Sequence, residues 1–558
     1  MKRIIKLPVI LAFSVLGIFS SCSDLSETIY SSIAAEKTTF SSEDIKNMIA
    51  PAYSNLRNIY WDWNGMFDLY EESSDLMMTP YRVGIGWGDL YVTMHNHTYH
   101  SYVGHFYTNW YDAYNGIDNI NKVLDLKSAV VTKYEPELRA IRALYYYILL
   151  DNFRNVPLET TMAHEAGYLP TQADPKKVFD FIVSELDSVK NNLGTDVSTA
   201  NYGHFNKYAA CMTLAKMYLN YNAWFGTSDN TYYQKAIDEI NVIVKDGKYS
   251  LAPNYTDPFV DNASSCPEVI FAIPFDYTYA SGNYLASKCL YSASAATFGL
   301  TISPWDGSCA IPQFIDTYDP DDKRLGMTWL IGQQYALNGD SVFASTIPTK
   351  VPLVYTQTVH SIDKPGAYPL EGARFHKYKI YSGKVAASGD DVPFFRYTDA
   401  LMIKAECLLR LGGYNGETEQ DAANIVTSIR ARAFTTNPTK ATRTVAQLKG
   451  PSVYAYGHSE NQGEQGKADV FVTSYEGGAD IELGGFLDDL AWEFVGEHHR
   501  RQDLIRFRVT SNGMNVYNGK SWFCKDAETN ASDTHKNIFP IYQDFIDSNK
   551  NMKQNTGY

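Results

Sequence analysis

The sequence predicts a mainly α-helical fold, with helix pairs as a scaffold and a loop-rich, aromatic region packed against them. Apolar residues recur at helical spacing from about residue 40 to 250 and again from 395 to 558. Between these parts, from about 252 to 395, the chain is rich in proline, glycine, serine and aromatic residues. Aromatic residues make up 14% of the chain, including 42 tyrosines. Tyrosine suits surfaces where one side of a ring packs and the other meets water or a polar ligand.

The first 21 residues have the pattern of a bacterial signal peptide. Basic residues at the start precede 7–19, an uncharged and mostly apolar run that is shorter than the roughly 20 residues of a membrane-spanning helix. The two small residues Ser20 and Ser21 then precede Cys22, an arrangement that resembles the lipobox of bacterial lipoproteins. We expect residues 1–21 to be removed and the Cys22 thiol to carry a diacylglycerol at the start of one domain, 22–558. The alternative is an ordinary secretory signal with an incidental cysteine.

Helical patterns in the scaffold come in pairs with short links. In 174–194, Asp174 is placed to cap a helix with Pro175 at its first position, and Gly194 is placed to end it. Further helices are predicted from Tyr134 and over 206–226, 232–251 (ending at Gly247), 396–413 and 421–434. Small residues such as Ala209 and Ala236 allow close packing, as in tetratricopeptide repeats, although no clean 34-residue period is visible.

The loop-rich region predicts short strands and exposed loops. "SCPEVIFAIPF" (265–275) and "KVPLVYTQTV" (350–359) each have a short strand-like core. The polar segment 436–480 predicts an exposed insertion in the second helical part. Loops on a rigid scaffold are where binding residues usually gather.

The charge balance argues against two classes of partner. The formal net charge is −15, and the basic leader makes the remainder still more acidic. Such a surface repels phosphate backbones, so we expect no nucleic-acid binding, and it offers no basic patch to anionic lipid. Membrane attachment would depend on the lipid at Cys22. Among the other cysteines, Cys289 with Cys309 is the pair considered for a disulfide, which their spacing leaves open.

Several segments, in chain order, resemble the SusD/RagB family of nutrient-binding lipoproteins. "RAIRALYYYILLDNFRNVPLET" (139–160) is similar to the family's helix followed by a "VPL" strand. "VPFFRYTDALMIKAECLLRLG" (392–412), "LAWEFVGEHHRRQDLIRF" (490–507) and the terminal "IFPIYQDFIDSNKNMKQNTGY" (538–558) also match. Tyr542 stands where proline is usual, and Gln502 where an aromatic residue is common.

This resemblance implies a helical fold with four tetratricopeptide-like units and a non-catalytic role. It implies a lipoprotein on the outer face of the outer membrane that covers a SusC-like TonB-dependent transporter and captures oligosaccharide or polysaccharide for it. Acidic residues after the lipidated cysteine act in such bacteria as a display signal, and Asp24 and Glu27 are compatible with it. A peptide or another nutrient as the ligand is the alternative within the same class of transporter. No cofactor is expected.

A glycan site needs aromatic platforms for the C–H faces of sugars and polar groups for their hydroxyls. The stretch "TPYRVGIGWGDLY" offers both, because Trp87 lies between two glycines in a polar loop. In the family a tryptophan in the corresponding loop often stacks on sugar. We therefore predict ligand contacts from Trp87 and from its neighbours Tyr81, Arg82 and Asp89, with loop packing of Trp87 as the alternative.

The loop-rich region supplies the second predicted set of ligand residues. Trp305 follows a proline and precedes Asp-Gly, which is turn chemistry. Trp329, Tyr284 and Tyr291 complete the set, although the apolar run around Trp329 favours burial there. The remaining tryptophans are expected to pack inside the protein: Trp61, Trp63, Trp110, Trp224 and Trp492.

Other chemistries are less well supported. His95, His97 and His100 lie close in sequence, but their spacing fits no single helix or strand face, so we predict structural histidines and no metal site. Three aspartates at 319–322 lack the glycine and distal glutamate of an EF-hand, which favours a polar turn. The charged run 493–503 resembles a salt-bridge network. A glycoside hydrolase would need two carboxylates flanking a sugar cleft, and the chain shows no GxSxG, HExxH or P-loop motif.

Overall fold

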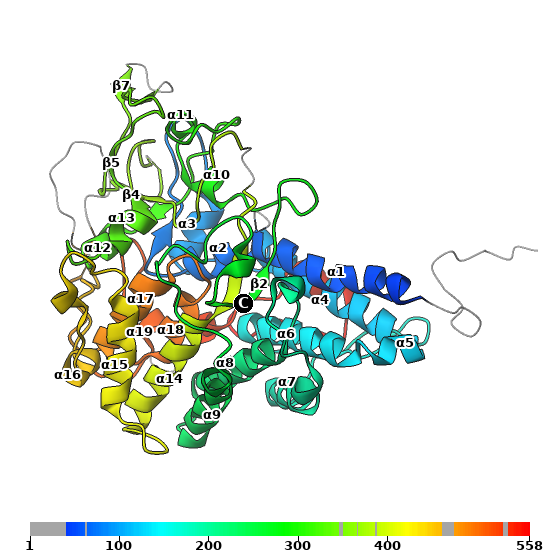
Figure 1. Cartoon of the computed structure of the whole chain (residues 1–558). Coiled ribbons are helices and arrows are strands. Elements are labelled where there is room, and N and C mark those ends of the chain that lie inside the picture. The colour runs from blue at the N-terminus through cyan, green and yellow to red at the C-terminus, as the bar shows by residue number, and fades with distance from the viewer. Residues whose placement is uncertain are drawn as a thin grey trace, which may run out of the picture.

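The computed structural model describes residues 41–61, 64–344, 350–364, 366–384, 388–459, 472, 474–527 and 534–558. Long helices occupy the lower part of the molecule in Figure 1, and the green segments of the loop-rich region gather at the top. The predicted mainly α-helical fold is confirmed. Within the described part of the chain, no helix is both long and apolar enough to cross a membrane.

Four helix pairs form the scaffold, and successive pairs pack on one another. Helix α1 packs on α4, α6 on α7, α8 on α9, and α14 on α15, while α4 also contacts α6 and α9 contacts α14. Their bounds are α1 Ser42–Trp61, α4 Gly104–Leu124, α6 Glu135–Phe153, α7 Pro175–Val189, α8 Lys207–Phe225, α9 Asn230–Asp246, α14 Tyr397–Leu411 and α15 Glu419–Arg430.

Helix ends follow the local chemistry of the sequence in most cases. The Asp174 side chain accepts a hydrogen bond from the Lys176 amide at the start of α7, as predicted. Helix α9 ends at Gly247, whose left-handed backbone (φ 60°) suits glycine. The predicted stop at Gly194 was wrong, because α7 ends at Val189 and a 3-10 turn, η1 Lys190–Asn192, follows it.

Buried ion pairs connect the second helical part to the middle of the chain. Arg396 contacts Glu268, Glu493 and Glu497 within 3.0 Å, and Lys377 also pairs with Glu497. All five side chains are almost fully buried. The predicted salt-bridge network around 493–503 is therefore confirmed, and it ties helix α17 (Gly484–Phe494) to strand β10 (Val392–Arg396).

The region between the helical parts contains short elements only. Strand β2 (Val269–Ile273) pairs antiparallel with β10, with Ile273 opposite Val392, so this pair closes the excursion 274–391. The other strands are two residues long and pair as β1 with β3, β4 with β9, β5 with β8, and β6 with β7. Their bounds are β1 Met77–Met78, β3 Cys309–Ala310, β4 Trp329–Leu330, β5 Gly332–Gln333, β6 Phe343–Ala344, β7 Val351–Pro352, β8 Val354–Tyr355 and β9 Arg374–Phe375.

Short helices fill the remaining turns. They are α2 Met66–Glu71, α3 Leu90–His95, α5 Ala129–Thr132, α10 Leu285–Cys289, α11 Ser294–Phe298, α12 Pro312–Ile315, α13 Arg324–Thr328, α16 Val445–Lys449, α18 Arg500–Arg506, α19 Val516–Gly519 and α20 Gln543–Ser548. The 3-10 turns are η1, η2 Thr199–Asn201, η3 Ala263–Ser265, η4 Pro438–Ala441 and η5 His535–Asn537. One large apolar core runs through the helical parts, and a smaller cluster around Tyr291 and Tyr355 lies within the excursion.

Candidate functional site

The loop that carries Trp87 is a tight, glycine-rich turn just before α3. The Arg82 amide donates to the Gly86 carbonyl (2.6 Å), and the Gly86 amide donates back to Arg82 (3.0 Å). Trp87 itself has a left-handed backbone (φ 61°), which is uncommon for a large side chain. At Gly88 a Cβ would lie 2.9 Å from the Cβ of Tyr81, so only glycine fits there. The turn therefore fixes Trp87 at the edge of the scaffold rather than within it.

Trp87, Trp305 and Tyr284 come together from three separate segments. The Trp87 indole Nε1 donates to the Trp305 carbonyl at 2.9 Å. The rings of Trp305 and Tyr284 lie 5.5 Å apart between centroids, tilted by 36°. All three side chains are half-buried. The structure thus assembles three of the predicted platform residues into one partly exposed aromatic cluster, which we call the aromatic platform.

Main-chain hydrogen bonds hold the Trp305 turn against α10. The Trp305 amide donates to the Ser287 carbonyl (2.7 Å), and the Gly307 amide to the Lys288 carbonyl (2.6 Å). A Cβ at Gly307 would lie 3.2 Å from the Trp87 ring, so the indole rests directly over that glycine. The platform is therefore built from backbone contacts that leave little freedom to its rings.

A buried charge cluster lies beneath the platform. The Lys288 ammonium pairs with Asp68 and with Glu72 (3.1 Å), and it lies 4.5 Å from the centroid of the Tyr91 ring. Burial by itself raises the pKa of Asp68, but Lys288 and His105 outweigh burial and lower that pKa below its ordinary value. The Trp87 ring contacts Tyr91 edge-on at 5.6 Å. The charges here are paired inside the protein and form the floor of the site.

Arg82 was predicted to contact the ligand, and the structure corrects this. Its side chain is 0% exposed. The guanidinium donates to the carbonyls of Gly307 (2.9 Å) and Glu371 (2.7 Å). Arg82 therefore joins the Trp87 loop to the excursion from inside and has no surface to offer a ligand.

Tyr291 and Trp329 are also corrected. Tyr291 is 0% exposed and lies in the small core cluster with Tyr355. Trp329 is 2% exposed and packs edge-on against Phe375 (5.7 Å), because its strand β4 pairs with β9. Both residues sit in apolar surroundings, and neither can contact a ligand at the surface.

Tyr81 and Asp89 remain accessible. Tyr81 is half-buried, and the Lys364 ammonium lies 5.0 Å from its ring centroid. Asp89 is exposed at the N-terminus of α3, where its carboxylate makes no capping hydrogen bond. These two residues can offer hydroxyl and carboxylate groups next to the turn that carries Trp87.

The other tryptophans follow the prediction only in part. Trp110 and Trp492 are buried, whereas Trp224 is half-buried, with its Nε1 donating to Asp151 (3.0 Å) and Arg154 stacked on its ring. Trp61 is the last residue of α1, but its side chain is outside the described part of the chain. Trp63, Cys22 and residues 1–21 also lie outside the described residues.

Local contacts describe the cysteines, histidines and aspartates that were considered for a disulfide or a metal. Cys289 and Cys309 are both buried free thiols, so the considered disulfide is absent. His97 stacks on Tyr517 (4.2 Å), and burial lowers its pKa. Asp319 and Asp321 share Lys440 at 2.8 Å each. Among the described residues, no group of three or more His, Cys, Asp or Glu side chains is arranged to hold a metal.

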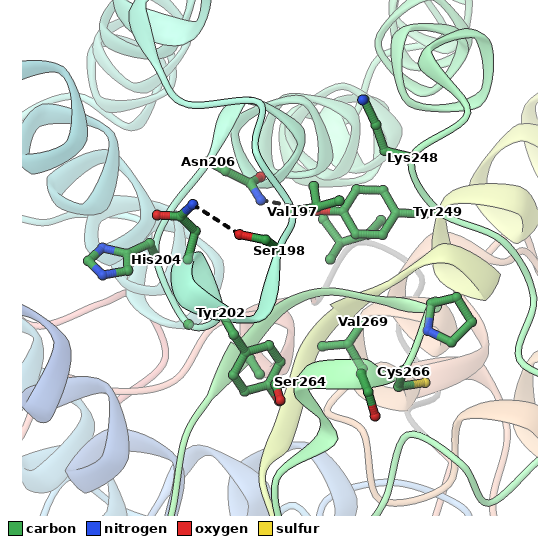
Figure 2. Close-up of a pocket in the computed structure, with 16 residues that line it drawn as sticks. Val197, Ser198, Tyr202, His204, Asn206, Lys248, Tyr249, Ser264, Cys266 and Val269 are labelled. Atoms are coloured by element: carbon green, nitrogen blue, oxygen red, sulfur yellow. Dashed lines mark hydrogen bonds between the residues drawn. The ribbon is translucent and has the colours of Figure 1, made fainter.

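Cavities away from the platform were not predicted from the sequence. One of about 110 Å³ lies between the segment that follows α7 and strand β2 (Figure 2). Polar side chains that line it hydrogen-bond to each other. For example, the Asn206 side-chain amide donates to the Tyr249 hydroxyl at 3.0 Å. It has room for a few waters, at roughly 30 Å³ each, and is too small for a ligand of two sugar units. Another, of about 520 Å³, lies against α4.

Comparison with known proteins places the fold in one class, that of surface-associated binding proteins on a helical scaffold. A family profile described as "SusD family" matches residues 311–558, and one described as "Starch-binding associating with outer membrane" matches 31–219. The chain belongs to the SusD/RagB family. The predicted family resemblance is therefore confirmed.

Similar proteins are distant in sequence and close in fold. The starch-binding protein SusD of Bacteroides thetaiotaomicron is 23% identical over 78% of this chain and 74% of its own. SusD-like protein P25 of Formosa agariphila is 22% identical over 90% and 89%. Among solved structures, a SusD superfamily protein from Parabacteroides distasonis superposes with a TM-score of 0.69 at 19% identity, covering 93% of this chain and 100% of its own. Surface glycan-binding protein A from B. thetaiotaomicron, solved with laminarihexaose, gives 0.65 at 19%, covering 92% and 99%.

Proposed function

We propose that this protein captures glycans at the cell surface by stacking sugar rings on the aromatic platform. The observation that carries the proposal is the convergence of Trp87, Trp305 and Tyr284 from three segments into one half-exposed cluster. Sugars present flat C–H faces to such rings and hydroxyls to nearby polar groups. Tyr81 and Asp89 are the accessible residues that would hydrogen-bond those hydroxyls.

The relatives support this ligand class. One is named a starch-binding protein, and another was solved in complex with laminarihexaose. A single aromatic contact contributes about 0.5–1.5 kcal/mol beyond burial. Three rings therefore support binding in the micromolar to millimolar range, which suits release to a second protein.

The second protein in this proposal is a SusC-like TonB-dependent transporter of the outer membrane. The chain would be held beside it by the lipid on Cys22, with Asp24 and Glu27 directing display on the outer face. The match to a family described as associating with the outer membrane supports this location.

The proposed role is binding without catalysis. Hydrolysis of a glycosidic bond needs two carboxyl groups flanking the sugar, about 5–9.5 Å apart. Beside the platform, Asp68 and Glu72 are buried in pairs with Lys288, and Asp306 is buried against Arg374. Asp89 is exposed next to the platform, without a second accessible carboxylate among Asp68, Glu72 and Asp306.

Affinity electrophoresis against a panel of soluble neutral and charged polysaccharides tests the proposal. The chain from Ser23 onward retains every described residue and is the form to use. We expect retardation in at least one glycan, reduced at least about 3-fold by Trp305→Ala and more by Trp87→Ala with Trp305→Ala. Tyr475→Ala, which removes a ring that is 79% exposed and lies elsewhere, is the matched control.

Unchanged retardation in the double variant would contradict the assigned site. Binding of peptides with no retardation by any glycan would move the ligand to the alternative class. Release of shorter sugars from a retarding glycan would contradict the non-catalytic role.

A further inference from the structure

One face of α4 carries a line of aromatic side chains that lies outside the platform. Tyr107, Trp110, Tyr111 and Tyr114 follow helical spacing, and Asp118 extends the same face by one turn. The rings of Tyr107 and Tyr111 stack at 5.2 Å. The Phe545 ring, from α20, stacks on Tyr107 at 5.2 Å and on Trp110 at 5.9 Å.

A cavity of about 520 Å³ opens beside this face. It is bounded by α4, by the segment 157–170 and by the C-terminal segment 545–552. This volume is in the range of small-ligand sites, which run from about 300 to 1,000 Å³. The three walls come from distant parts of the sequence, so the cavity is a product of the fold.

Hydrogen bonds between the walls fix the cavity's shape. The side chains of Asn549 and Asn551 donate to the carbonyls of Pro170 and Leu169, both at 2.9 Å. On the other side, the Asp125 carboxylate accepts from the Met162 amide at 2.7 Å. The segment 157–170 is thereby attached at its end and near its middle, although it contains no helix or strand.

Tyr168 is held in one orientation while remaining accessible. Its ring is stacked on His164 (4.0 Å, 3° between planes), and its hydroxyl donates to Glu159 at 2.8 Å. His164 in turn pairs with Glu159 at 3.1 Å. The Tyr168 side chain is nevertheless 47% exposed. A fixed, half-exposed ring is what a stacking platform requires, because little freedom is lost on binding.

Asp118 adds an accessible hydrogen-bond acceptor to the cavity. Among the described residues, none donates a hydrogen bond to its half-buried carboxylate. Burial raises the pKa of Asp118, and the nearby Lys122 ammonium offsets part of that rise. A ligand hydroxyl at this position would donate to the carboxylate in place of water.

We propose that this cavity, which we call the α4 pocket, is a second saccharide-binding site selective for neutral sugars. Tyr168, Phe545 and Trp110 supply apolar faces, and Asp118 and Glu159 supply hydroxyl acceptors. The two carboxylates would repel uronic-acid and sulfated glycans. The α4 pocket shares a ligand class with the proposed function, but it uses no residue of the platform and is tested apart from it.

The test compares variants of the chain from Ser23 onward on paired neutral and sulfated or uronic polysaccharides. The double variant Trp87→Ala with Trp305→Ala removes the platform. In that background we expect residual retardation by a neutral glycan, reduced about 3- to 10-fold by Tyr168→Ala and by Asp118→Asn. Tyr475→Ala and Asp180→Asn, at an exposed ring and an exposed carboxylate elsewhere, are the matched controls.

Hydrogen–deuterium exchange of the unaltered chain with the same glycan locates the contacts. Protection of 157–170 is expected in addition to protection of 81–91. If the double variant loses all retardation and Tyr168→Ala changes nothing in the unaltered chain, the α4 pocket is rejected and the platform stands. If the double variant keeps binding that neither Tyr168→Ala nor Asp118→Asn reduces, the α4 pocket is rejected, and the platform is rejected with it where that binding equals the binding of the unaltered chain. If no glycan retards the unaltered chain, or if charged glycans bind the α4 pocket as well as neutral ones, this proposal is rejected.

Discussion

At the residue scale, surroundings decide the role of each aromatic ring. Trp87, between two glycines in a polar loop, was predicted at a surface and is half-exposed there, whereas Trp329 and Tyr291 proved to be core. The apolar run around Trp329 already favoured burial. For Tyr291 no such signal exists, because its burial depends on Tyr355, which is 64 residues away in sequence. Arg82 was misassigned for a related reason, since its acceptors are carbonyls more than 200 residues distant.

Lys288 offers a prediction at the same scale. Lys288→Met would leave Asp68 and Glu72 buried without their counter-charge, and such losses typically cost about 3–5 kcal/mol. We expect the free energy of unfolding, measured by urea denaturation, to fall by about this amount. Lys449→Met, which breaks an exposed pair with Glu419, should cost less than about 1 kcal/mol. Equal urea midpoints for Lys288→Met and the unaltered protein would contradict the role given to the charge cluster.

At the scale of elements, the long helices were predictable and the strands mostly were not. A periodic apolar stripe with a cap, as at Asp174, identifies a helix from sequence alone. Strands of two residues have no period to detect, and their pairing is set by distant partners, as for β1 with β3. The α4 pocket could not be predicted from the sequence, because its walls come from α4, 157–170 and 545–552, which only the fold brings together.

Helix packing gives a prediction of its own at Gly116. A Cβ there would lie 2.3 Å from the Tyr145 ring, which is buried between α4 and α6 and whose hydroxyl donates to the Ala52 carbonyl. Gly116→Ala should therefore destabilise the protein by about 1–3 kcal/mol, as overpacking generally does. The matched control is Gly194→Ala, where no atom lies within 4 Å of the added methyl group. Thermal unfolding of both variants measures the difference, and similar melting temperatures would show that the helices can separate without penalty.

At the scale of the whole molecule, the proposed location depends on Cys22, which lies outside the described residues. No described helix can cross a membrane, and the chain carries a net charge of −15 with no basic patch evident in the sequence. The proposed function assigns membrane attachment to the lipid on Cys22. The sequence alone suggested this, because a leader and its cleavage site are local patterns that need no fold.

Replacement of that residue tests the attachment. When the full chain is expressed in a bacterium that processes lipoproteins, Cys22→Ala should move the protein from the membrane fraction to the soluble fraction. Cys524→Ala, which removes a half-buried thiol elsewhere, should leave it in the membrane fraction. Recovery of the unaltered chain in the soluble fraction would point to the ordinary secretory signal, and retention of Cys22→Ala in membranes would point to attachment through a partner protein.

The antiparallel contact between β2 and β10 has a consequence for how such proteins diverge. Because Ile273 lies opposite Val392, the 118 residues between them leave and re-enter the scaffold at one point. A segment with fixed, adjacent ends can be exchanged during evolution as long as the replacement keeps its buried pairs with the helical parts, such as Lys288 with Asp68 and Lys377 with Glu497. Arg82 sets a condition on that exchange, since it joins the Trp87 loop to Gly307 and Glu371 from inside. A change of ligand would therefore arise most readily when the Trp87 loop and the segment 274–391 are inherited together as one unit.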